Sequence, residues 1–175
     1  FEKSDSLYYR DFNIEIKRKI NKHWKLGIKY FHFDFNNDVN VVSKTAKGIV
    51  NANIGVVDVL WKINRKHSLR WELQGLWTGK DKAGKLQDKG HWATLLVEYT
   101  FSPNFFVAVM DQWNYANPIQ SQRLHYLIGS AGYNFGASKL MVTYGRQREG
   151  IFCIGGVCRP VPATNGLTVT FTSSF

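Results

Sequence analysis

Apolar and polar residues alternate with a period of two along almost the whole chain. The last ten residues show this clearly, because Leu167, Val169 and Phe171 share one face while threonines occupy the positions between them. Segment 68–78 repeats the pattern, with Leu and Trp opposite Arg, Glu and Gln. A period of two is that of a β-strand with two unlike faces, and no helical period is sustained. The sequence therefore predicts an all-β chain.

Nine segments follow this alternation and are predicted to be strands. They are 7–18, 24–35, 48–63, 68–78, 92–101, 105–114, 124–135, 139–148 and 164–175. In the third segment the adjacent apolar residues Val56 and Val57 interrupt the alternation, which indicates a β-bulge.

The connections between the predicted strands alternate between short and long. Turns such as 102–104 and 136–138 are short, whereas the long polar connections are 36–47, 79–90, 115–123 and 149–163. Transmembrane barrels have tight turns at one rim and longer loops at the external rim, and about 9–11 tilted residues cross the hydrocarbon layer. We therefore predict an antiparallel up-and-down transmembrane β-barrel. It forms a single barrel domain or barrel segment over residues 1–175, with the four long connections external.

The strand count bears on how the barrel closes. If Phe175 lies at the periplasmic rim, about nine strands place the start of the first strand at the external rim. Complete bacterial barrels, by contrast, have an even number of strands. We expect the C-terminal part of a larger even-stranded barrel. A closed eight-stranded barrel, in which segment 7–18 is not a strand, is the alternative.

Composition and charge leave the partner open. Aromatic residues make up 15% of the chain, and the formal charge is +10. Aromatic residues near strand ends are typical of the girdles at membrane interfaces, although they also fill the core of soluble β-domains. The positive charge suits anionic lipid headgroups, an anionic solute or nucleic acid.

Alternation also places six charged residues on one predicted face of the first, second and fourth strands. They are Glu15, Lys17, Lys25, Lys29, Arg70 and Glu72. In a barrel this face is the lumen, where opposite charges can pair across strands. The two interpretations are a pore lining that favours anions and a packed lumen held by salt bridges, and we favour the second.

Candidate chemistry is sparse. Cys153 and Cys158 flank a pair of glycines in the last long connection, which favours a disulfide over free thiols or a metal site. Ser130, His125 and Asp111 could form a catalytic triad on paper, but nothing in the sequence brings them together. We therefore predict no catalytic residue, cofactor or metal site, and do not expect an enzyme.

The C-terminus resembles the β-signal of outer-membrane proteins, which alternates apolar and polar residues and ends in Phe. The residues that carry this likeness are Gly166, Leu167, Val169, Phe171 and Phe175. The resemblance implies recognition by the barrel-assembly machinery, which pairs with an exposed edge strand.

The last third of the chain resembles an uncharacterised family of Bacteroidota outer-membrane proteins with a Cys-x4-Cys last loop and a terminal Phe. The likeness rests on Gln122-Arg123-Leu124-His125-Tyr126, Tyr144-Gly145-Arg146-Gln147-Arg148-Glu149-Gly150 and Cys153-Ile154-Gly155-Gly156-Val157-Cys158-Arg159. It implies a barrel in the bacterial outer membrane and supplies no catalytic residues.

Three functions remain open at this stage. The favoured one is an integral outer-membrane barrel with a structural, scaffold or complex-forming role. Its expected partners are outer-membrane lipid, the assembly machinery and other outer-membrane proteins. The second is a porin-like channel for small, anionic solutes. The third is a soluble basic β-domain that stacks single-stranded nucleic acid on aromatic residues; we do not favour it and expect no nucleic acid partner.

Overall fold

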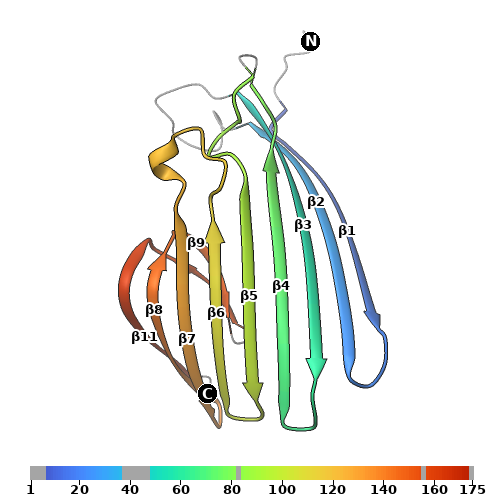
Figure 1. The fold of residues 1–175 in the computed structure, drawn as a ribbon, viewed down its shortest axis with the longest axis vertical. Helices are drawn as coiled ribbons and strands as arrows, with labels where there is room; N and C mark the ends of the chain where they lie inside the picture. The colour runs from blue at the N-terminus through green and yellow to red at the C-terminus, as the bar shows by residue number, and fades with distance from the viewer. Residues whose placement is uncertain (1–6, 37–47, 82–83, 155–156, 174–175) are drawn as a thin grey trace.

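The computed structural model describes residues 7–36, 48–81, 84–154 and 157–173. Nine long strands form one antiparallel sheet, in which successive strands are neighbours (Figure 1). The strands are β1 (Tyr9–Lys19), β2 (Trp24–Asn36), β3 (Ile49–Lys62), β4 (His67–Thr78), β5 (Trp92–Phe101), β6 (Phe105–Trp113), β7 (His125–Phe135), β8 (Ser138–Gln147) and β11 (Thr164–Ser173). Each of the nine predicted strands corresponds to one of them, so the all-β, up-and-down antiparallel architecture is confirmed.

Two features differ from the sequence prediction. The connection 149–163 contains a second, two-stranded sheet, made of β9 (Gly150–Ile154) and β10 (Val157–Val161). In addition, β1 and β11 are the two edges of the large sheet and do not pair with each other over the described residues. The sheet is therefore open, and closure into a barrel stays a prediction.

The predicted bulge in β3 is wrong. Pairing of β3 with β2 and β4 runs without a break through Val56 and Val57. Val56 is buried on one face of the sheet, and Val57 is exposed on the other. Two successive apolar residues are tolerated because both faces of the sheet accept apolar side chains at this level.

The two faces of the sheet are defined by the β9–β10 hairpin, which covers one of them. We call the covered side the inner face and the opposite side the outer face. On the inner face, one buried cluster joins β5, β6, β7 and β8 to β9. Its members are Leu96, Phe106, Ala108, Met110, Ile128, Met141, Phe152 and Ile154. The hydrophobic core of the described structure thus lies between the hairpin and half of the sheet.

The short turns gather at one end of the sheet, called here the turn end, and the long connections at the other, the loop end (Figure 1). Two turns are stabilised by the same pattern of asparagine hydrogen bonds. The Asn21 side-chain oxygen accepts hydrogen bonds from the amides of His23 and Trp24, and Asn64 does the same for Lys66 and His67. Asparagine favours turns because its side chain can replace a backbone acceptor in this way. These turns fix the register of β1 with β2 and of β3 with β4.

Only one short 3-10 helix, η1 (Gln120–Gln122), interrupts the β structure of the described residues. None of their helices has the length and apolar character needed to cross a membrane.

Candidate functional site

The outer face of the sheet is apolar and exposed. Val109 in the middle of β6 is 55% exposed, and Val169 on β11 is 61% exposed. The same face carries exposed apolar residues on every strand of the large sheet. They include Phe12, Ile14, Ile16, Ile28, Val57, Leu73, Leu95, Val107, Leu127, Val142, Leu167 and Phe171. Soluble monomers rarely expose apolar surface of this extent on one face.

Strand register makes this surface continuous over β1–β5. One row crosses these five strands from Ile16 through Ile28, Val57, Leu73 and Leu95, each paired with the next, and it meets Asp111 on β6. The row arises directly from the alternation in the sequence, since equal parity along each strand places these residues on one side.

Aromatic residues border the outer face at the turn end. Trp24, Trp61 and Trp71 come from three adjacent strands and stack, with ring centroids of the first two 5.4 Å apart. Phe101 and Phe105 are cross-strand partners at the same end of β5 and β6. Amphipathic rings at this level are those expected at a membrane interface.

The predicted charged residues share the inner face, as their strand register requires. Glu15 forms salt bridges with Lys29 at 2.8 Å and with Lys17 at 3.1 Å. Lys25 and Lys29 alternate on β2 and point to the same side. These residues lie on β1 and β2, beyond the part of the inner face that the hairpin cluster occupies.

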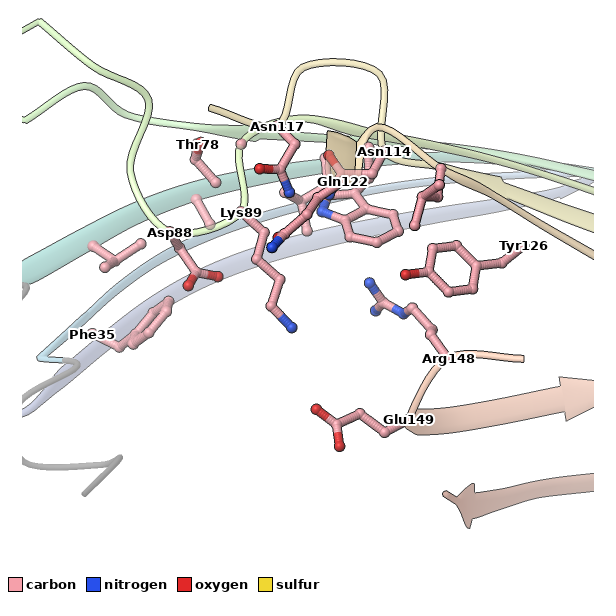
Figure 2. A pocket seen from close by; sticks show the side chains of 16 residues that line it. Phe35, Thr78, Asp88, Lys89, Asn114, Asn117, Gln122, Tyr126, Arg148 and Glu149 are labelled. Carbon is pink, nitrogen blue, oxygen red and sulfur yellow. The ribbon is translucent and has the colours of Figure 1, made fainter. Parts of the chain in front are cut away.

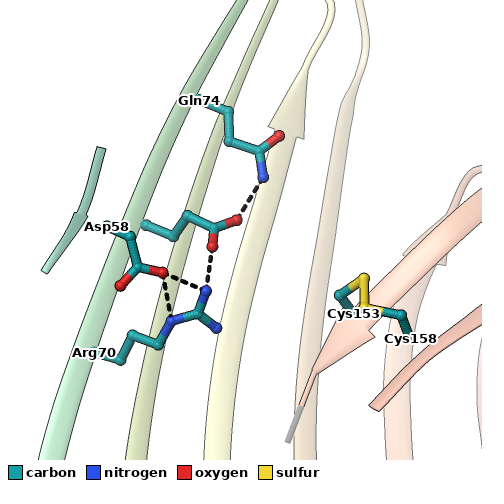
Figure 3. The surroundings of a disulfide bond; sticks show 6 residues. Asp58, Arg70, Gln74, Cys153 and Cys158 are labelled. Carbon is teal, nitrogen blue, oxygen red and sulfur yellow. Dashed lines mark hydrogen bonds and ion pairs between the residues drawn. A yellow bond between two sulfur atoms is a disulfide. The ribbon is translucent and has the colours of Figure 1, made fainter. Parts of the chain in front are cut away.

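Arg70 is the centre of a second charged group on the inner face. Its Nε donates to Asp58 at 2.8 Å, and its terminal nitrogen also contacts Glu72, which in turn accepts a hydrogen bond from Gln74 (Figure 3). The sequence analysis did not include Asp58, although it is the direct cross-strand partner of Glu72. Because it lies directly after the Val56–Val57 pair, the expected bulge concealed its face.

The hairpin holds the two cysteines opposite each other. Cys153 pairs with Cys158 in the register of β9 and β10, and the two form a disulfide (Figure 3). Phe152 and Ile154 flank Cys153 and are buried against the sheet, whereas both cysteines are exposed. The disulfide thus links the two strands on the side of the hairpin that faces away from the sheet. The only sequence signal for β9 is the alternation of Phe152 and Ile154 around Cys153, and three residues are too few to predict a strand.

The residues of the proposed assembly signal lie on an edge strand. Leu167, Val169 and Phe171 are exposed on the outer face of β11, which pairs only with β8 in the described structure. Gly166 lies opposite Gly145 on β8. Phe175 is outside the described residues.

The components of a catalytic triad are divided between the two faces. Asp111 and His125 are side by side on the outer face, with 2.7 Å between Oδ2 and Nδ1. Ser130 is buried on the inner face, where its hydroxyl is 3.1 Å from that of Thr143. No group of three or more potential metal ligands occurs among the residues that the structure describes.

A family model matches residues 1–175, the whole chain, and it describes a family of unknown function, DUF6029. The chain belongs to this family. No curated protein and no solved structure matches it. Family membership accords with the resemblance seen in the last third of the chain, while the bacterial group and the membrane location remain expectations.

Proposed function

We propose that this chain is part of an integral β-barrel of the bacterial outer membrane, with a structural or complex-forming role and no catalysis. A single observation carries the proposal, namely the exposure of apolar side chains over one whole face of the sheet. Apolar residues are exposed on the outer face of all nine strands, whereas ion pairs and a buried cluster occupy the inner face.

The outer face is best explained by contact with lipid. Leaving a Val, Leu, Ile or Phe side chain in water instead of burying it costs about 1.5–3 kcal/mol, and this face exposes many such side chains. Hydrocarbon removes that cost without requiring any protein partner to cover a surface nine strands wide. A strand length of 9–14 residues is also sufficient to cross the hydrocarbon layer when the strands are tilted.

A porin-like role is the second candidate, and one observation favours it. The hairpin packs against β5–β8, whereas Lys17, Lys25 and Lys29 line a cavity of about 430 Å³ on the inner face of β1–β4, together with Asp58 and Arg70. A basic inner surface beside the hairpin would attract small anions. The salt bridges of Glu15 and Arg70 reduce this attraction, so the structural role remains the primary proposal.

A soluble domain that binds nucleic acid accounts for less of the outer face. The bases of a nucleic acid would stack on aromatic residues that alternate with cations, whereas most exposed residues in the middle of the outer face are aliphatic. Lys17, Lys25, Lys29 and Arg70 line the cavity on the opposite, inner face.

The test replaces an exposed residue in the middle of the outer face by a charge. Val109→Lys should lower the free energy of unfolding in lipid vesicles by about 2–4 kcal/mol if the site contacts the middle of the bilayer. In a soluble protein the same exposed position should tolerate Lys within about 0.5 kcal/mol.

Gln112→Lys provides the matched control, because Gln112 lies three residues along the same strand on the inner face. Its unfolding free energy should change by less than that of Val109→Lys. Equal tolerance of both substitutions, combined with a protein that is monodisperse without detergent, would refute the membrane proposal.

A further inference from the structure

A cavity of about 460 Å³ with both polar and apolar walls lies at the loop end of the inner face (Figure 2). Trp92, Tyr126 and Asn114 line it from the ends of β5, β7 and β6, and Arg148 lines it directly after β8. Lys89 belongs to the connection between β4 and β5. The cavity volume is within the usual range for small-molecule sites, about 300–1,000 Å³. It is separate from the charged residues of β1–β4 and from the disulfide.

Arg148 is the residue of this cavity best placed to bind a ligand. Its guanidinium lies over the indole of Trp92, 4.5 Å from the ring centroid, and Figure 2 shows it beside Tyr126 and directed into the cavity. No salt bridge between described residues includes it. Burial lowers the pKa of this guanidinium, while Tyr126 and Glu149 act in the opposite direction. A half-buried, planar cation held on an aromatic face is preorganised to bind a carboxylate through two parallel hydrogen bonds.

Two further polar groups of the cavity lack partners. Asn114 is only 2% exposed, and its side-chain oxygen has no hydrogen-bond partner among the described residues. The Thr78 hydroxyl oxygen also has no hydrogen-bond partner among the described residues. An unsatisfied buried acceptor costs about 1–3 kcal/mol, so Asn114 is expected to receive a donor from a bound molecule. A hydroxyl group on a ligand would supply it.

The walls of the cavity are held in place by contacts between connections. The backbone of Gly90 approaches Ala116 so closely that a Cβ on Gly90 would lie 2.1 Å from the Ala116 carbonyl oxygen. Arg123 donates from its Nε to the Asn117 carbonyl at 3.0 Å, which joins the two ends of the β6–β7 connection. The cavity is therefore formed before any ligand arrives.

The charges of the lining indicate the charge of the ligand. Arg148 and Lys89 are balanced by Asp88 and Glu149, which also line the cavity. Asp88 and Glu149 would repel a dianion such as phosphate about twice as strongly as a monoanion, whereas the guanidinium alone can neutralise a monoanion. Trp92 and Tyr126 add apolar surface beside it.

We propose that this cavity binds a small monoanionic carboxylate that also carries hydroxyl groups, such as a sugar acid. The carboxylate is held by Arg148, a ligand hydroxyl donates to Asn114, and the body of the ligand packs beside Trp92. The site does not depend on membrane placement, because every group that forms it is on the inner face or in the loop-end connections.

The test measures binding of glucuronate and galacturonate by titration calorimetry, up to 10 mM ligand, using the purified protein in whichever state keeps it monodisperse. Glucose and glucose 6-phosphate are the neutral and dianionic comparisons. Arg148→Gln should weaken binding of the preferred acid at least tenfold, and Arg148→Lys less. Arg65→Gln, which removes the same charge at the turn end, should leave binding unchanged. Asn114→Leu should weaken acid binding without creating affinity for glucose.

Several results would overturn the proposal. They are the absence of saturable binding of both sugar acids to the wild type, equal binding of glucose or glucose 6-phosphate, and undiminished binding by Arg148→Gln. Circular dichroism of each variant separates loss of the site from loss of the fold. If Arg148→Gln does not fold, Asn114→Leu and the comparison among the four ligands still decide the outcome.

Discussion

The β9–β10 hairpin is held on the inner face mainly by Phe152 and Ile154. Phe152 is 3% exposed and belongs to the cluster formed by β5–β8. Replacing Phe152 with Ala removes a buried ring that no other residue of the hairpin can replace. The disulfide keeps β9 and β10 joined to each other, so the substitution should release an intact hairpin from the sheet.

The size of the effect follows from the buried side chains. Full burial of each of Phe152 and Ile154 contributes about 1.5–3 kcal/mol. Together they contribute about 3–6 kcal/mol to the free energy that holds the hairpin on the sheet. Loss of the Phe ring removes about 3 kcal/mol, at the lower end of measured Phe→Ala costs. Since about 1.4 kcal/mol corresponds to a factor of ten, the open state of the hairpin should become roughly 100 times more populated.

Hydrogen exchange read by mass spectrometry measures this opening directly. Peptides covering 150–161 should exchange about two orders of magnitude faster in Phe152→Ala, while peptides covering β3 and β4 keep the wild-type rate. Phe171→Ala is the matched control, because Phe171 is 62% exposed on the outer face. Unchanged exchange of the hairpin in Phe152→Ala, or equal acceleration in Phe171→Ala, would refute the assignment of Phe152 as the anchor.

Three further predictions concern stability and assembly. Arg70→Met should lower the free energy of unfolding by about 2–4 kcal/mol, because Asp58 is left without its partner; adding Asp58→Asn should recover part of the loss, as measured by urea midpoints. Gly145→Ala should cost more than the roughly 1 kcal/mol expected for Gly136→Ala, since a Cβ at Gly145 would lie 2.2 Å from a backbone oxygen and one at Gly136 meets open space; equal midpoints would contradict this. Deletion of Phe175 should slow membrane assembly in cells, seen as heat-modifiable mobility, more than it lowers the urea midpoint of refolded protein; normal assembly with a large loss of midpoint would reverse the claim.

The alternation of residues was sufficient to predict the large sheet. Each of its strands places unlike residues on two faces, as Leu73 and Gln74 do on β4, and such a local pattern needs no knowledge of the partner strand. For the same reason Glu15 and Lys29 could be assigned to one face before their salt bridge was known.

The rest could not be predicted because it depends on contacts between distant segments. The hairpin strands have five residues each, and β10 contains Pro160, which is a poor strand residue. Burial of Phe152 depends on a surface formed by four other strands. The cavity around Arg148 combines strand ends with two connections, so no continuous sequence motif marks it.

The most direct test of the membrane placement is a spin-label accessibility scan along β6. Single cysteines replace residues 107–110 one at a time in a variant in which Cys153 and Cys158 are serine, and the protein is placed in lipid bilayers. Labels at Val107 and Val109 should collide mainly with oxygen, which dissolves in lipid. Labels at Ala108 and Met110, which are buried on the inner face, should be shielded from both oxygen and a water-soluble nickel complex. A period of two in the oxygen accessibility is the predicted result, and ready collision of the Val107 and Val109 labels with the nickel complex would contradict it.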